Sequence, residues 1–278
     1  MAKKQFALVL DLNKCVGCHT CSIGDRTTWT NKKGMECHWW NSVECKPRGG
    51  YPHGWENLGG GFDKKGKLVL GKLPQEEDYD DPNLGEDTPA GEYPNLWYYY
   101  LPRLCNHCTK PACAAACPRK AIYKREDGIV LIDEDRCRGY RYCIRACPYK
   151  KIYFNAALNK SQKCILCFPR MEKDYPPVCV EVCPGQIRLA GDVEDPTNVV
   201  HKLVKMEKLA LPLHPEYGTE PNVYYIPPLW VPRDHLAGVF GPGVDEALRK
   251  LRNLTPELRE ILTTVYPKPD RISAKVVI

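Results

Sequence analysis

Most of the residues in this chain that could do chemistry are cysteines, and their spacing is typical of iron–sulfur ligands. All of the sixteen cysteines except Cys37 and Cys45 lie in four short blocks. The two central blocks each end in Cys-Pro, and in a two-cluster ferredoxin this last cysteine binds the cluster opposite to that of the other three. The spacing therefore predicts two ligand sets between residues 105 and 147. One set is Cys105, Cys108, Cys113 and Cys147, and the other is Cys117, Cys137 and Cys143.

Tyr140 stands where the second of these sets should have its remaining ligand. A cubane cluster is normally held by cysteine thiolates, and an uncharged phenol does not replace one. The sequence therefore predicts a [3Fe–4S] cluster here, with Tyr140 at the missing-ligand position.

The first and last blocks are expected to pair with each other across the whole chain. The first block has cysteine spacing of the ferredoxin kind but carries Asp25 at its fourth position, and the last block ends in Cys183-Pro184. If the last ligand of each of these blocks binds the cluster of the other block, as in a ferredoxin, the two blocks form two further ligand sets. They are Cys15, Cys18, Cys21 and Cys183, and Asp25, Cys164, Cys167 and Cys179.

Asp25 is interpreted as an iron ligand. A carboxylate is a competent oxygen ligand for iron, although it is harder and more weakly held than thiolate. We therefore expect a [4Fe–4S] cluster that loses one iron readily on oxidation. In the alternative, Asp25 is a bystander and the site holds three irons. With Asp25 as ligand, the cofactors are three [4Fe–4S] clusters and one [3Fe–4S] cluster.

Cysteine pairs of this kind also occur in zinc sites. Zinc blocks lack the third close cysteine and the Cys-Pro, which both recur here, so iron–sulfur chemistry is favoured. Cys37 and Cys45 lie outside the blocks and are either buried thiols, the favoured alternative, or a disulfide.

Four polar residues near the blocks have two interpretations each. His19 and His107 could donate hydrogen bonds to cluster sulfur, but surface positions are favoured. Lys150 and Lys151 are expected to form a solvated face or to add positive charge near the three-iron site.

The elements that must position these ligands indicate an α+β fold built from two interleaved bacterial-type two-cluster ferredoxin modules. Residues 1–30 and 156–191 form the outer module, which begins with an apolar strand over 5–12. Residues 96–155 form the central module, with a strand at 95–101 and a β-hairpin at 121–132. Residues 31–95 are expected to be an irregular insertion that makes a subunit contact.

The cysteine-free tail, 192–278, is expected to wrap the core with extended and helical segments. Asp195-Pro196 is typical of a helix start, with Val200, Leu203 and Met206 on one face. Residues 217–228 should be extended, and helical spacing recurs in two later apolar sets. They are Val244, Leu248 and Leu251, and Leu258 and Leu262 after Thr255-Pro256.

The formal charge of +6 does not indicate a nucleic-acid partner. Cluster-bound thiolates would bring the holoprotein near neutrality, and the basic residues are scattered among acidic ones. No apolar run reaches the roughly 18–20 residues of a membrane span. The N-terminus leads directly into a strand and not into an export signal.

The first and third blocks with their flanks, residues 11–21 and 137–155, closely resemble the iron–sulfur beta subunits of the dimethyl sulfoxide reductase family. Within it they are similar to the class II branch, which includes nitrate, selenate and (per)chlorate reductases, nitrite oxidoreductase, and dimethylsulfide and ethylbenzene dehydrogenases. Residues 40–44 and 216–225 also match, so the resemblance covers nearly the whole chain. An aromatic residue in place of one cysteine of the third block marks this branch.

The resemblance implies a complex in which this chain is a non-catalytic relay of electrons. A catalytic alpha subunit would hold a molybdenum bis-pterin cofactor and face the Cys15–Cys183 set, and a gamma subunit with haem b would face the three-iron set. Folded export with the alpha subunit would give a periplasmic location; the alternative is the cytoplasmic face of the membrane. The rival function is a stand-alone polyferredoxin, against which the long insertion and the tail argue.

Overall fold

The computed structural model describes residues 4–79 and 88–263, which form a mixed α/β structure. Its central sheet has four strands in the order β8 (Arg188–Asp192), β1 (Phe6–Asp11), β10 (Val223–Ile226) and β9 (Leu211–Pro212). Strand β1 runs antiparallel to β8 and parallel to β10, and every residue of it is buried. The strand predicted at 5–12 is therefore confirmed. It is covered on both faces, which explains its continuous apolar run.

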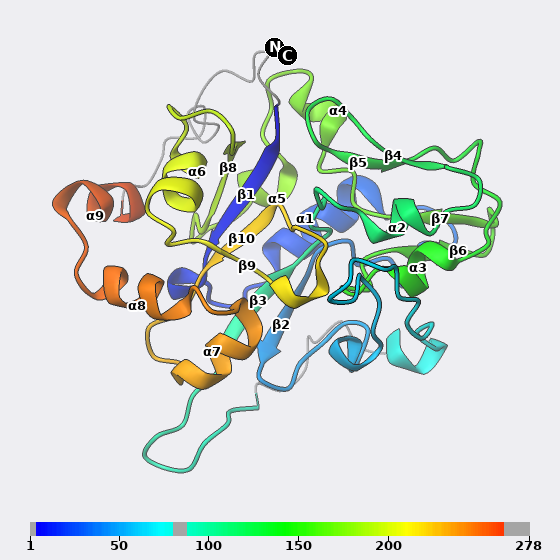
Figure 1. The fold of residues 1–278 in the computed structure, drawn as a ribbon. Coiled ribbons are helices and arrows are strands. Elements are labelled where there is room, and N and C mark those ends of the chain that lie inside the picture. The colour runs from blue at the N-terminus through cyan, green and yellow to red at the C-terminus, as the bar shows by residue number, and fades with distance from the viewer. Residues whose placement is uncertain (1–3, 80–87, 264–278) are drawn as a thin grey trace.

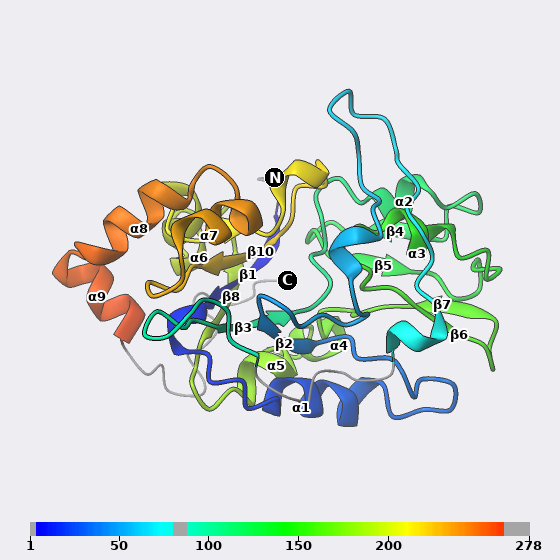
Figure 2. The same cartoon turned by 90° about the horizontal axis from the view of Figure 1, so that it is seen from below.

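The sheet separates the helical tail from the cysteine-bearing segments, as Figure 1 shows with the tail helices at the left. Short helices lie among the cysteine blocks, and Figure 2 shows α1 beside α5. These helices are α1 (Thr20–Trp29), α2 (Ala112–Ala115), α3 (Tyr142–Ala146), α4 (Phe168–Met171) and α5 (Val178–Glu181). In the part of the chain that the structure describes, no helix is long and apolar enough to cross a membrane.

Three antiparallel strand pairs complete the core. The predicted hairpin is confirmed as β4 (Ile122–Lys124) with β5 (Val130–Ile132). A second hairpin follows the third cysteine block, formed by β6 (Tyr153–Asn155) and β7 (Lys160–Gln162). The remaining pair is β2 (Ser42–Lys46) with β3 (Tyr99–Arg103), which begins four residues later than the strand expected at 95–101.

The expectation that residues 31–95 are irregular throughout was wrong, because β2 lies within them. Two buried charges explain the pairing of β2 with β3. Glu44 on β2 and Arg103 on β3 are 0% and 1% exposed, and Arg103 Nε donates to Glu44 Oε1 at 2.6 Å. A charged residue in a strand becomes buried only when it finds such a partner, and this partner lies far away in the sequence.

Arg103 ties three parts of the chain together. Its Nη1 donates to the Tyr149 carbonyl at 2.7 Å and its Nη2 to the Tyr51 carbonyl at 2.8 Å. The guanidinium also lies 3.8 Å from the centre of the Trp55 ring. Although burial opposes it, the charge of Arg103 holds the pKa of Glu44 below its usual value. The insertion is therefore anchored to the central cysteine-bearing region by one saturated guanidinium.

The tail departs from expectation at its first helix. Helix α6 (Val199–His201) is capped by Asn198, whose Oδ1 accepts from the Val200 N–H at 2.9 Å, and not by Asp195. It continues in a π-helical turn over Lys202–Met206. Because this turn is wider than an α-helical one, Met206 leaves the buried face and is 58% exposed.

The later tail elements agree with the sequence pattern up to residue 263. The apolar sets predicted for two helices are buried on α8 (Val244–Arg252) and α9 (Pro256–Thr263), and α7 (Arg233–Phe240) precedes them. The extended segment predicted at 217–228 contains β10, so the tail does not merely wrap the core but supplies sheet strands. The predicted tail beyond 263 lies outside the described residues.

Replacing Arg103 by methionine should lower the free energy of unfolding by about 3–5 kcal/mol, because the buried Glu44 would lose its 2.6 Å ion pair and keep only the more distant Lys46 at 3.6 Å. Anaerobic urea unfolding followed by tryptophan fluorescence measures this loss. Arg259→Met, at an exposed position, is the control and should change the value by about 0.5 kcal/mol or less. A loss below about 1 kcal/mol for Arg103→Met, as for an exposed ion pair, would contradict the anchoring role.

Candidate metal centres

The first predicted set, Cys15, Cys18, Cys21 and Cys183, lines one cavity of about 330 Å³. Pairing of Leu10 on β1 with Arg188 on β8 brings the chain just before Cys15 beside the chain just after Cys183. Gly17 makes the loop possible: it has φ +66°, and a Cβ there would lie 2.4 Å from the Tyr100 ring. Cys18 is exposed, so this site lies at the surface.

The second set is buried, and the structure brings Asp25 to its three cysteines. Burial and, after it, the negative charge of Asp25 raise the pKa of Cys164 and of Cys167, and the same carboxylate contributes at Cys179. Helix α1 carries Asp25 and packs on α5, which carries Cys179.

The carboxyl group of Asp25 is 4% exposed. Burial raises its pKa to about 7, an effect that the charges of Arg188 and Lys151 and the Asn41 N–H oppose. Such a group is held charged by a bound cation, and its position among three cysteines suits an iron ligand. The structure therefore offers four donors at this site, three of sulfur and one of oxygen.

Hydrogen bonds from this chain to the sulfur atoms of the second set were not predicted. Trp29 Nε1 donates to Cys167 Sγ at 3.1 Å, and the Val178 N–H donates to the same sulfur at 3.4 Å. The Leu166 N–H donates to Cys164 Sγ at 3.3 Å. Such donors stabilise thiolate and tune the potential of a bound cluster. The spacing of Trp29 four residues after Asp25 on α1 was the available signal.

The third set, Cys105, Cys108, Cys113 and Cys147, lines a cavity of about 380 Å³. Burial raises the pKa of Cys108 and of Cys113, and neighbouring thiolates of the same set raise both further. Thiols in this state keep their protons until a metal replaces them. The arrangement suits a cluster that is bound with proton release.

The fourth set, Cys117, Cys137 and Cys143, lines a cavity of about 340 Å³ together with Tyr140. Tyr140 is 57% exposed. Backbone N–H groups of Ala121 and Ser161 donate to the sulfur atoms of Cys117 and Cys137 at 3.3 and 3.4 Å. This site therefore offers three thiols and a partly solvated phenol, as the sequence indicates for a three-iron cluster.

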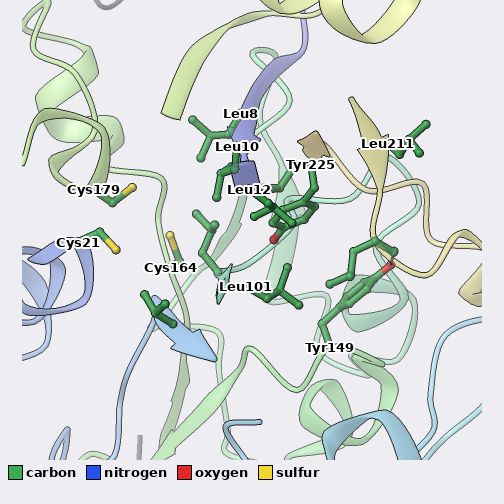
Figure 3. Close-up of a cluster of buried hydrophobic side chains, with 14 of the residues drawn as sticks. Leu8, Leu10, Leu12, Cys21, Leu101, Tyr149, Cys164, Cys179, Leu211 and Tyr225 are labelled. Atoms are coloured by element: carbon green, nitrogen blue, oxygen red, sulfur yellow. Dashed lines mark hydrogen bonds between the residues drawn. The ribbon is translucent and has the colours of Figure 1, made fainter. Parts of the chain in front are cut away.

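The four sets follow one another in space. Burial is the main cause of the raised pKa of Cys179 in the second set, and the charge of Cys21 in the first set makes a smaller contribution. Figure 3 shows these two residues close together beside the apolar side chains of β1. Cys105 of the third set has the same effect on Cys164 of the second. The third and fourth sets share the packed helices α2 and α3, which carry Cys113 and Cys143.

Two expectations about polar neighbours, those for His107 and for the two lysines, were wrong, while the one for His19 is not contradicted. His107 is 1% exposed and not at the surface, and its Nδ1 accepts from the Val130 N–H at 3.1 Å. His19 is half-buried with φ +56°. Lys150 and Lys151 are 0% and 1% exposed and form no solvated face.

The two lysines are buried because their ammonium groups find acceptors inside the protein. Lys150 Nζ donates to the Arg145 carbonyl at 3.0 Å, and Lys151 Nζ donates to Ser42 Oγ at 2.7 Å. Burial lowers the pKa of Lys150 to about 8, against the charge of Cys147. The positive charge of Lys150 therefore lies near Cys147 of the third set, whereas the alternative expectation had placed it near the three-iron site.

Within the described residues no disulfide joins Cys37 and Cys45; Cys37 is exposed and Cys45 is buried on β2. The same residues contain no group of three or more His, Cys, Asp or Glu side chains arranged to hold a single metal ion. Two buried cations beside the sets, Arg188 and Lys163, were missed by the sequence analysis. Lys163 directly precedes Cys164, and this adjacency was a signal that could have been used.

Comparison with known proteins gives the family. Residues 96–193 match the model of the 4Fe–4S dicluster domain. The chain is 51% identical to the dimethylsulfide dehydrogenase subunit beta of Rhodovulum sulfidophilum, over 91% of each chain. It is 48% identical to the selenate reductase subunit beta of Thauera selenatis and 47% identical to the chlorate reductase subunit beta of Ideonella dechloratans, in both cases over 90% of this chain and 91% of the relative.

These matches cover nearly the whole chain, and the dicluster domain includes three of the four cysteine blocks. Iron–sulfur chemistry is thereby confirmed over the zinc alternative. The chain belongs to the iron–sulfur beta subunits of the dimethyl sulfoxide reductase family, and it is an electron-transfer subunit of a molybdoenzyme complex that is not itself catalytic.

Proposed function

We propose that this chain relays electrons through four iron–sulfur clusters between a molybdenum bis-pterin alpha subunit and a haem b gamma subunit or another carrier. One observation carries the proposal: the four sets are neighbours in a single series whose two end sets reach the surface. Cys18 is exposed at one end and Tyr140 at the other. Of the two sets between them, the second is buried and the cysteines of the third are partly buried, which suits a relay that admits partners mainly at its ends.

The proposed cofactors are three [4Fe–4S] clusters and one [3Fe–4S] cluster, held by the sets described above. When bound, they supply one-electron redox chemistry. The chain itself holds the clusters in sequence, excludes water from the second, and donates hydrogen bonds to the ligand sulfurs of that second set. Asp25 completes the second set, and Tyr140 leaves the fourth one ligand short.

Two interleaved ferredoxin modules remain the proposed organisation. Residues 1–30 and 156–191 form the outer module, supported by the pairing of β1 with β8 and the packing of α1 on α5. Residues 96–155 form the central module, 31–95 the insertion and 192–278 the tail. Because β10 pairs with β1, the tail acts as a structural part of the outer module.

The alpha subunit is proposed to dock beside the first set. A groove of about 760 Å³ lies next to Cys15 and is lined by Val16, the run Leu96–Tyr100 and Trp230. Val16 is 68% exposed and Trp230 is 51% exposed. Aromatic residues are enriched in the buried cores of protein interfaces, and an interface here would bring the partner within reach of the first cluster. The insertion leads directly into this groove, in keeping with its expected subunit contact.

The haem b subunit is proposed to face the fourth set, where Tyr140 and Tyr142 are 57% and 43% exposed. A periplasmic location is also proposed, with export of the folded chain together with the alpha subunit. The relatives named above are beta subunits, which supports assembly with further subunits. The alternatives are the cytoplasmic face of the membrane for location and a stand-alone polyferredoxin for function.

Anaerobic purification of the native protein tests the relay. It should elute with a molybdenum-containing polypeptide, well above the 31.6 kDa of this chain, and carry iron and acid-labile sulfide. Low-temperature EPR should show a [3Fe–4S] signal in the oxidised protein. Elution as a single free chain with full cluster content would favour the polyferredoxin, whereas little iron or sulfide would refute the cluster sets.

Asp25→Cys should give the second site an all-thiolate cluster that survives oxidation. The native protein should release about one iron per chain on mild oxidation, because carboxylate holds iron more weakly than thiolate. Iron analysis and EPR before and after ferricyanide treatment measure the difference. Asp25→Asn is the opposite control and should carry the three-iron form from the start. Equal iron content and equal oxidation sensitivity in native protein and Asp25→Cys would rule out carboxylate ligation.

Trp230→Ala should weaken binding to the alpha subunit by about 2 kcal/mol or more, as expected for an aromatic residue at the centre of an interface. Pull-down of the tagged beta subunit with quantification of bound molybdenum measures the effect. Tyr123→Ala, which removes a 47% exposed tyrosine on β4, is the control and should bind as the native chain does. Unchanged binding of Trp230→Ala would place the interface elsewhere.

A further inference from the structure

Arg188 is an arginine buried between the first and second sets. It is the first residue of β8 and lies opposite Leu10 of β1. It is 2% exposed and follows Cys183 by only a short segment. A guanidinium cannot lose its proton in a protein, so this position holds a permanent positive charge.

The hydrogen bonds of Arg188 point to sulfur. Its Nη2 donates to Cys21 Sγ at 3.2 Å and to Asn41 Oδ1 at 3.2 Å. The buried Nε and Nη1 have no hydrogen-bond acceptor among the residues that the structure describes. These remaining N–H groups are therefore available to a group bound in the adjacent cavity, which Arg188 lines together with the cysteines of the first set.

The anions around Arg188 come from both sets. Burial alone would lower the pKa of Arg188, but the charges of Cys21, Cys179 and Cys183 outweigh it and raise that pKa. Burial has the largest effect on the pKa of Cys179 and of Asp25 and raises both. The charge of Arg188 has the next largest effect and lowers both. The guanidinium is thus balanced by thiolates and a carboxylate from two neighbouring sites.

Asn41 fixes this geometry from the insertion. Its Oδ1 accepts from Arg188, while its backbone N–H lies near Asp25 and helps to lower the pKa of that carboxyl group against the effect of burial. Asn41 is 2% exposed, so both contacts are shielded from water. One residue therefore holds the guanidinium in place against the first set and also contacts the oxygen ligand proposed for the second.

We propose that Arg188 is a positioning residue that holds a fixed positive charge between the first and second cluster sites and raises the reduction potential of both. This inference rests on the proposed relay function. Reduction adds a negative charge to a cluster, and a nearby positive charge in a poorly solvated interior favours the reduced form. Because the same charge acts on both sites, it stabilises an electron on either side of the junction.

Arg188→Gln removes the charge but keeps a hydrogen-bond donor, and anaerobic redox titration followed by EPR measures each cluster. We expect the equilibrium constant for one-electron reduction of the first and second clusters to fall at least tenfold, which corresponds to 59 mV. The third and fourth clusters should change much less. Arg188→Lys should restore most of the loss. Arg252→Gln, which removes an exposed charge on α8, is the control and should shift none of them.

A second measurement uses the native sequence, so that its result does not depend on whether the Arg188→Gln variant folds. Protein labelled with ¹⁵N-arginine should show ¹⁵N hyperfine coupling to the reduced first cluster by pulsed EPR, and Arg188→Lys should lose this coupling. If Arg188→Gln fails to retain iron while Arg188→Lys retains it, the need for the charge is supported.

Two results would overturn the proposal. One is full cluster content in Arg188→Gln with unchanged potentials at the first and second sites. The other is native labelled protein with intact clusters and no ¹⁵N coupling at the first. Failure of the relay function itself would be distinguishable, because it would appear in the native protein, as elution of a free single chain or as absent cluster signals, and not as a difference between native protein and the Arg188 variants.

Discussion

The burial of sulfur anions is the constraint on which the rest of this structure depends. Burial raises the pKa of Cys15 to about 12 and that of Cys143 and Cys167 to about 11, so that these thiols resist ionisation until a cation takes the place of the proton. The chain therefore has to supply positive charge and hydrogen-bond donors inside its core. Arg188, Lys151 and Lys163 are buried for this reason, beside cysteines and not at the surface.

The same constraint explains why segments far apart in the sequence converge. No single block contains a complete set, so the first block meets the last through β1 and β8, and the tail fills the other edge of β1 with β10. The insertion contributes Glu44, which is satisfied by Arg103, and Asn41, which is bonded to Arg188. The cluster sites are thus held by contacts outside the blocks, and the insertion is part of their support.

The distribution of exposure along the series suits an electron relay. The second set is buried, while the end sets lie beside exposed aromatic residues, Trp230 at one end and Tyr140 at the other. An all-buried series could exchange electrons with nothing, and an all-exposed one would lose selectivity.

The sequence alone predicted the sulfur sets, the family and five of the ten described strands, because cysteine spacing within a block and apolar patterning within a strand are local properties. Ligation itself, Asp25 included, stays a prediction. The tertiary structure determined the contacts between residues far apart in the sequence, which local patterns do not encode. It paired β2 with β3, capped α6 with Asn198, and buried His107, Lys150 and Arg188. The identity of a charged residue does not show whether its side chain is solvated or buried. Its burial is favourable only when residues distant in the sequence supply hydrogen-bond or ion-pair partners.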